Sequence, residues 1–351
     1  MTSPASTGTT QAAALPDAPA LPDGIHQIPL PTPFPVGRVN VYLLEGSPLT
    51  LVDTGVNTAT ALDRLEEELE RIGYRLSDIE LLLLTHEHVD HVGLSTLIAK
   101  RSGCNIAAYA PLAELWNPEH DARAVYGTRL AWGVKQLERH GYPTEVTLGA
   151  QPTLHLMFAL GARPVIDHAL RPGDTIRAGS RDWEVLHRPG HSPSDLLFVE
   201  RSSGTAIAGD HILGTTSSNA VLSPPLEVTM PDETTERLHS LQLFVESMKA
   251  TAAEGLELLL PGHGPVVGPP GDLVAERLAF HAKRAGVFLD MLDESEPRTV
   301  YELATRMWKG VAMIQPSLTH SEVIGHLDLL AADGAIGEVM IGDGVVGFVR
   351  R

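Results

Sequence analysis

The chain has 351 residues, of which 43% are hydrophobic, and a formal net charge of −18. This length suits two domains with a sizeable core, and no stretch has the length and apolar character of a membrane span. The negative charge is spread along the chain and repels polyanions, which makes nucleic acid an unfavourable partner. The single cysteine, Cys104, excludes an internal disulfide framework and suits a reducing cytosol, so we expect a cytoplasmic location.

The first elements alternate strands and helices after a polar start. Residues 1–24 are rich in Ala, Pro, Thr and Ser and contain no basic residue, which predicts a disordered tail rather than a signal peptide. Strand patterns follow over residues 26–55. Apolar residues at helical spacing predict a helix over residues 58–72 and another over residues 94–101.

A buried strand predicted over residues 81–84 is followed by Thr85 and then by the sequence His86-Glu87-His88-Val89-Asp90-His91. In a helix, these spacings would scatter the side chains around the axis, whereas a turn at a strand end can fold them around one point. Imidazole and carboxylate are ligands that suit zinc, iron or manganese. The segment therefore predicts a metal site.

Three further potential ligands each end an apolar, strand-like stretch and adjoin a glycine: His191, Asp210 and His263. Glycine lets the backbone turn tightly and approach a metal closely. Taken in order, the motifs HxHxDH, GH, GDH and PGHG resemble those of the metallo-β-lactamase superfamily, and the resemblance spans about residues 25–270.

The resemblance implies an α/β fold, a four-layer αββα sandwich, with a two-metal site along one sheet edge. The implied ligands of the first metal are His86, His88 and His191. Those of the second metal are Asp90, His91 and His263, and Asp210 is implied to bridge the two metals. We expect zinc at both positions, with iron or manganese as alternatives.

Two carboxylates leave a charge of about +2 on two divalent ions, which favours a metal-bridging hydroxide as the nucleophile. We therefore assign Asp90 and Asp210 as catalytic residues as well as ligands. Asp53 matches a family position at which a carboxylate beneath the site accepts a hydrogen bond from a ligand imidazole. The alternative for Asp53 is a residue that opens a turn before Gly55.

The pattern predicts a helical insertion over residues 111–170, which contains two of the four tryptophans, Trp116 and Trp132. Superfamily members carry insertions here that lie beside the metals, so this segment is a candidate substrate lid. An aromatic stripe is equally typical of core packing or of a dimer contact, and a homodimer stays an open alternative. Strands are then predicted over residues 183–187 and 196–199, and a long helix over residues 232–254.

Residues 280–351 predict three helices and a hairpin, which resembles a winged helix. This gives a metallo-β-lactamase domain over residues 25–275 and a small C-terminal winged-helix-like domain over residues 280–351. The presumed recognition helix, residues 321–332, carries Glu322 and Asp328 and no Lys or Arg, and the region has ten acidic against seven basic residues. Because phosphate contacts supply most of the affinity for a duplex, we expect a packing or dimerisation module and no nucleic acid partner.

The preferred function is a binuclear metal-dependent hydrolase of a small acyl substrate, which is a thioester, an ester or a lactone. One alternative is a phosphodiesterase or ribonuclease of the same fold, and another is a mononuclear iron oxygenase or an oxygen-reducing enzyme resembling flavodiiron proteins. That last branch usually has Glu where His88 stands here, and Asp210 disfavours a true β-lactamase. Glyoxalase II resembles this chain in its ligands, but it binds glutathione through a helical C-terminal domain.

Overall fold

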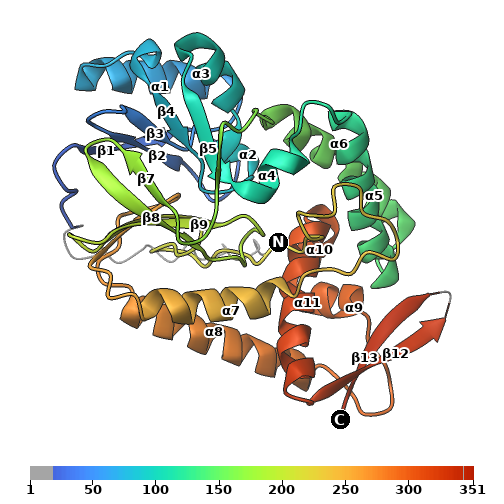
Figure 1. Ribbon diagram of the computed structural model, residues 1–351. Helices are drawn as coiled ribbons and strands as arrows, with labels where there is room; N and C mark the ends of the chain where they lie inside the picture. Colours follow the sequence, from blue (N-terminus) through green and yellow to red (C-terminus); the bar gives the residue numbers. More distant parts are fainter. Residues whose placement is uncertain (1–18, 343) are drawn as a thin grey trace, which may run out of the picture.

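The computed structural model describes residues 19–342 and 344–351, so most of the predicted tail lies outside the described residues. Two sheets face each other, and helices cover the outer face of each (Figure 1). This arrangement is the four-layer αββα sandwich of the α/β fold that the sequence predicted.

The first sheet holds its six strands in sequence order, β1-β2-β3-β4-β5-β6. The strands are β1 Ile25–Leu30, β2 Val39–Leu44, β3 Thr50–Val52, β4 Leu81–Leu83, β5 Asn105–Tyr109 and β6 His168–Leu170. The first three strands pair antiparallel, whereas β3 to β6 pair parallel. The carboxyl ends of β3 and β4 therefore meet at one edge, where the chain turns into the predicted metal-binding segment.

The second sheet has the strand order β11-β10-β9-β8-β7. The strands are β7 Thr175–Ala178, β8 Arg181–His187, β9 Leu196–Glu200, β10 Thr205–Gly209 and β11 Leu258–Pro261. Both β8 and β10 pair antiparallel with β9, and β11 pairs parallel with β10. Consequently β8, β10 and β11 run in the same direction, and their carboxyl ends share one edge.

Amphipathic helices cover the outer faces of the two sheets (Figure 1). On the first sheet these are α1 Ala59–Ile72 and α3 Ser95–Ser102, and on the second they are α7 Ser240–Ala252 and α8 Gly271–Asp290. The α1 helix begins at Thr58, whose hydroxyl accepts a hydrogen bond from the Ala61 amide, and buries Leu65 and Leu69 against the sheet. Two short helices, η1 Leu76–Asp78 and α2 Val89–Val92, flank β4 in sequence.

The predicted helix over residues 232–254 is wrong at its start, because α7 begins at Ser240. Upstream, the Asp232 carboxylate accepts hydrogen bonds from the backbone and hydroxyl of Thr234, which holds a turn. Arg237 then pairs with Asp328 in the C-terminal region. Local side-chain bonds and this distant ion pair replace the helical hydrogen bonds.

The insertion forms three helices, α4 Ala110–Leu115, α5 Ala122–Arg139 and α6 Thr144–Leu160. The predicted insertion includes residues 168–170, but these form β6, which pairs with β5 in the first sheet. Trp116 and Trp132 are buried, and Trp132 Nε1 donates to the Thr235 carbonyl at 3.1 Å. Both tryptophans therefore serve packing, which was the second interpretation of this aromatic segment.

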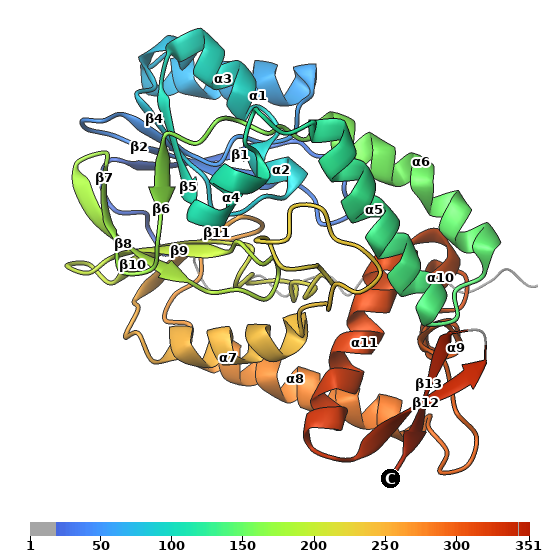
Figure 2. The ribbon, with the colours of Figure 1, turned by 45° about the vertical axis from the view of Figure 1, so that its right-hand side comes forward.

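The C-terminal region contains α9 Val300–Trp308, α10 Val311–Ile314, α11 Pro316–Ala332, β12 Ile336–Gly342 and β13 Val345–Arg350. The α11 helix begins at Pro316 rather than at Ser321, because proline fits the first turn of a helix. It packs against α7, α8 and α9, and most of its residues are buried. Figure 2 shows α5 running from the sandwich to this region, where it contacts α11 and β13.

Trp183 lies fully buried between the two sheets, and its Nε1 donates to the Ala178 carbonyl at 3.1 Å. We predict that Trp183→Ala lowers the free energy of unfolding by about 3–5 kcal/mol, because it leaves a cavity in the core. Chemical denaturation measures the change. Leu156→Ala on α6, where the side chain is 52% exposed, should change the same quantity by less than about 0.5 kcal/mol. Similar effects of both changes would contradict this account of the core.

Two pairs of buried histidines join α11 to its neighbours. His320 Nε2 lies 2.8 Å from His140 Nδ1 after α5, and His326 Nε2 lies 3.2 Å from His281 Nδ1 in α8. Burial lowers the pKa of His140 to about 3 and the pKa values of His281 and His326 to about 4, and nearby Arg237 and Arg284 act in the same direction. Burial also lowers the pKa of His320 well below its usual value. The folded state therefore keeps these rings neutral.

We predict that the free energy of unfolding falls on acidification from pH 7 to pH 5. The unfolded rings have a pKa of about 6.5, so their neutral forms stabilise the fold fully above that pH. The stabilisation is lost as the pH falls toward the folded pKa values, which are about 4 for His281 and His326. His281→Gln should flatten the pH dependence measured by denaturation, whereas His155→Gln, at an exposed position of α6, should not. Equal slopes in the two variants would refute the assignment.

Candidate metal centre

The structure brings all seven predicted ligands to one edge of the sandwich, where the carboxyl ends of β4, β8, β10 and β11 meet. Their ligand atoms form three overlapping groups within 4.8 Å, which are His86, His88 and His191; His86, His91 and Asp210; and Asp90, His91 and His263. Residues far apart in the sequence thus converge because the strands that precede them end at one place.

A glycine makes this convergence sterically feasible. A Cβ atom added to Gly262 would lie 2.3 Å from Asp210 Oδ1 and 2.7 Å from His91 Cε1. Any side chain at this position would collide with two of the candidate ligands. The motif Pro261-Gly262-His263 therefore lets β11 place His263 beside the segment that follows β10.

The nitrogen and oxygen atoms of the cluster lie at short distances. His88 Nδ1 and His191 Nε2 are 2.8 Å apart. His263 Nε2 lies 3.2 Å from Asp90 Oδ2 and 3.4 Å from Asp210 Oδ2, and His91 Nε2 lies 3.5 Å from Asp210 Oδ1. Asp210 Oδ2 also lies 3.6 Å from His191 Nε2, so Asp210 stands between two groups of histidines, one with His191 and the other with His91 and His263.

Several of these atoms are buried without a hydrogen-bond partner among the described residues, namely His86 Nε2, His91 Nε2, His263 Nε2 and Asp210 Oδ1. Each such group costs on the order of 1–3 kcal/mol, and four in one cluster call for a ligand that satisfies them together. Imidazole nitrogens and carboxylate oxygens are a donor set for divalent transition metals. The residues present fit such ions.

The opposite ring nitrogens of three candidate ligands are held by hydrogen bonds. His91 Nδ1 lies 2.8 Å from Asp53 Oδ2, His191 Nδ1 lies 2.9 Å from the Asn219 carbonyl, and His263 Nδ1 lies 2.8 Å from the Arg38 carbonyl. Each Nδ1 donates to its oxygen, which leaves Nε2 as the free lone pair. These three rings are therefore oriented for coordination through Nε2.

Asp53 lies beneath the cluster and is buried. Besides its contact with His91, its carboxylate accepts hydrogen bonds from the Thr85 amide at 2.9 Å and the Thr85 hydroxyl at 2.7 Å. His86 Nδ1 lies 3.0 Å from the same hydroxyl oxygen. Asp53 thus contacts one candidate ligand directly and reaches another through Thr85, as expected of a carboxylate that orients ligand rings.

The electrostatics of the cluster keep some of its imidazoles neutral and its carboxylates charged. Burial and the neighbouring histidines lower the pKa of His86 well below its usual value, and burial lowers the pKa of His191 to about 4. Burial alone would raise the pKa of Asp210, but His91, His263 and His191 together outweigh it, and the pKa falls well below its usual range. Burial likewise disfavours a charge on His91, yet Asp210 and Asp53 raise its pKa well above normal. The charged carboxylates and the neutral imidazoles of the cluster therefore favour a cation between them.

Sequence reasoning missed the polar residues that hold the candidate ligand loops together. Ser194 receives a hydrogen bond from the Glu87 amide at 3.1 Å and donates to the Glu87 carboxylate, which ties the loop after β8 to the loop after β4. Asp195, which is buried, accepts bonds from the amide and hydroxyl of Ser192. The run of hydroxyl residues that follows His191 is the signal that could have revealed this network.

Comparisons with known proteins found several that are similar to this chain. A family model described as the Metallo-beta-lactamase superfamily matches residues 34–263. The Bacillus subtilis (strain 168) protein named "Probable metallo-hydrolase YqjP" is 30% identical over 90% of this chain and 94% of its own length. "Hydroxyacylglutathione hydrolase GloC" of Haemophilus influenzae is 25% identical over 41% of this chain and 56% of its own.

Two further similarities extend over most of the chain. "Atrochrysone carboxyl ACP thioesterase nsrC" of Aspergillus novofumigatus is 23% identical over 89% of this chain and 79% of its own length. Among solved structures, a metallo-beta-lactamase family protein from Thermus thermophilus is 27% identical, with a TM-score of 0.73. That match covers 95% of this chain and 100% of the solved chain.

We predict that the purified protein binds about two divalent ions per chain, as expected of a two-metal site. Asp210→Ala should lower the bound metal to about one ion or fewer, because it removes the carboxylate that lies between the two groups of histidines. Elemental analysis measures the ions, and circular dichroism checks the fold. The matched control is His211→Gln, because His211 lies next in sequence but bonds to Thr251 outside the cluster. Two ions retained in Asp210→Ala would contradict the assignment.

Proposed function

Because the chain belongs to the metallo-β-lactamase superfamily, we propose that it is a binuclear metal-dependent hydrolase of a small acyl substrate, which is a thioester, an ester or a lactone. Metal-dependent hydrolysis follows from the family and from the relative named a probable metallo-hydrolase. The observation that carries the binuclear proposal is the set of buried, unpartnered atoms shared by His86, His91, His263 and Asp210.

We assign the seven candidate ligands as the sequence suggested. His86, His88 and His191 would hold one ion, and Asp90, His91 and His263 would hold the other. Asp210, whose carboxylate groups with His86 and His91, would serve both sites. Zinc suits this set of imidazoles and carboxylates, with iron and manganese as alternatives. Two such ions would supply Lewis acidity and lower the pKa of a bound water.

Hydrogen bonds within the chain orient the rings of the candidate ligands. Asp53 and the carbonyls of Arg38 and Asn219 fix the rings of His91, His263 and His191, respectively. Because every one of these bonds uses Nδ1, the Nε2 atoms are presented together to the interior of the cluster. Asp90 and Asp210 keep negative charge at the same place, which makes them the proposed catalytic carboxylates.

The names of two relatives support an acyl substrate. One is named a thioesterase and aligns with 89% of this chain, and another is named a hydroxyacylglutathione hydrolase. A thioester is therefore our first choice within the acyl class. The family assignment and the metallo-hydrolase name favour hydrolysis over the iron oxygenase alternative.

The C-terminal region supports a packing role over the recognition of nucleic acid. The α11 helix, which would enter a DNA groove in a winged helix, is largely buried against α7, α8 and α9. It also carries no Lys or Arg, so it offers no cationic contact to phosphate. Nucleic acid is therefore not a proposed partner.

Among the described residues, no helix has the length and apolar character that a membrane crossing requires. A cytoplasmic location and a homodimer stay predictions of the sequence.

We predict that the zinc-loaded protein hydrolyses an acyl thioester with a kcat/KM at least about 100-fold above that for bis-nitrophenyl phosphate. Asp210→Ala should lower the thioester rate by more than about 1000-fold, since the metal pair would be lost. The His211→Gln variant should keep most of the activity. Faster cleavage of the phosphodiester, or of RNA, that disappears in Asp210→Ala would favour the nuclease alternative. Metal-dependent oxygen consumption without hydrolysis would favour the oxygenase.

A further inference from the structure

The segment 219–222, which follows β10, lies between the candidate ligand His191 and helix α11. On the ligand side, His191 Nδ1 donates to the Asn219 carbonyl at 2.9 Å, and the Val221 amide donates to the His191 carbonyl at 3.2 Å. The ring and the backbone of His191 are therefore both bonded to this one segment. Its position determines where His191 Nε2 points.

On the other side, α11 holds the same segment by two hydrogen bonds. Asn219 Nδ2 donates to the Leu318 carbonyl at 3.1 Å, and the Leu222 amide donates to Ser321 Oγ at 3.0 Å. Ser321 is buried, and its hydroxyl donates to the Ser317 carbonyl at 2.7 Å. Because that proton is committed, a lone pair of Ser321 Oγ is directed at the Leu222 amide.

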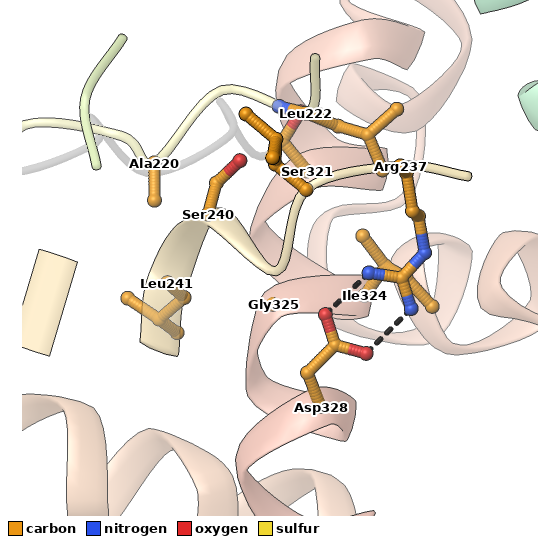
Figure 3. A pocket seen from close by; sticks show the side chains of 10 residues that line it. Ala220, Leu222, Arg237, Ser240, Leu241, Ser321, Ile324, Gly325 and Asp328 are labelled. Carbon is orange, nitrogen blue, oxygen red and sulfur yellow. Dashed lines mark hydrogen bonds and ion pairs between the residues drawn. The ribbon is translucent and has the colours of Figure 1, made fainter. Parts of the chain in front are cut away.

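Close packing fixes α11 against α7 and against Arg237 just before it, both of which lie beside the segment 219–222 (Figure 3). A Cβ atom added to Gly325 would lie 2.8 Å from Leu241 Cβ, so only glycine allows this approach of α7 and α11. One turn further, Arg237 binds Asp328 through two hydrogen bonds of 2.5 Å, drawn as dashed lines in Figure 3. The contact of α11 with α7 and with the segment 219–222 is therefore held by steric fit and by an ion pair as well as by Ser321.

We propose that Ser321 and Asn219 are positioning residues for the metal centre, and that α11 thereby completes the site that contains His191. The inference rests on the proposed role of His191 as a metal ligand. Ser321 and the Leu318 carbonyl hold the segment, the Asn219 carbonyl keeps the proton of His191 on Nδ1, and Nε2 is left free toward His88. Partners that fix a ligand imidazole in this way strengthen metal binding.

Zinc titration against a competing chelator tests the proposal on the full chain. Ser321→Ala removes the acceptor of the Leu222 amide, and Asn219→Ala removes the bond to α11 but keeps the backbone carbonyl. Both variants should weaken one of the two zinc sites by about 10-fold or more and change the other much less. The absorption bands of the Co²⁺-substituted protein should shift for the same reason, because they report the ligand geometry.

Thr319→Val is the matched control. Thr319 is a buried hydroxyl residue of α11, and its bonds go to Gln315, Pro316 and Tyr142 rather than to the segment 219–222. Zinc affinity within about 2-fold of the unchanged protein is expected here. Ser321→Ala and Asn219→Ala variants that bind both ions as tightly as Thr319→Val would overturn the proposal, as would an equal loss at both sites. Absence of metal from the unchanged protein would instead refute the proposed function, so the two failures are distinguishable.

Discussion

The metal edge imposes the central constraint on this molecule, because it buries two carboxylates and four imidazoles in one place, with the half-buried His88 beside them. Buried charges and unpartnered nitrogens are unfavourable unless a compensating charge is present. The cluster therefore depends on a rigid scaffold that holds it in place. The two sheets provide this scaffold, since β3, β4, β8, β10 and β11 direct their carboxyl ends to this edge. Large apolar residues such as Trp183 and Phe198 fill the space between the sheets.

The seven candidate ligands could be found from the sequence because each lies in a short motif directly after an apolar strand. The contacts that orient them were harder to predict, because they join residues far apart in the chain. Asn219 meets His191 across 28 positions, and Ser321 meets Leu222 across 99 positions. No periodicity or motif marks such pairs, since tertiary packing alone creates them.

The errors in the predicted elements have local causes. The short strand at residues 168–170 exposes two of its three residues and lacks an alternating pattern, so the sequence alone does not separate it from the predicted helical insertion. The start of α7 was placed too early because apolar spacing says nothing about the turn that Asp232 holds. The sequence predicts the start of α11 too late, at Ser321, whereas the helix begins at Pro316 because proline fits the first turn of a helix.

The insertion and the C-terminal region share one hydrophobic core, in which Tyr142 and Val146 pack with Phe288, Val323 and Phe348. This core reaches the metal edge by two routes. At the end of α6, the Leu160 carbonyl accepts a hydrogen bond from the Asn57 amide, and at α11 Ser321 holds Leu222. A lid that moved alone would have to break the shared core, which costs apolar burial at about 25 cal/mol per Å². The insertion and the C-terminal region therefore form one packed unit beside the metal edge rather than a lid that moves by itself.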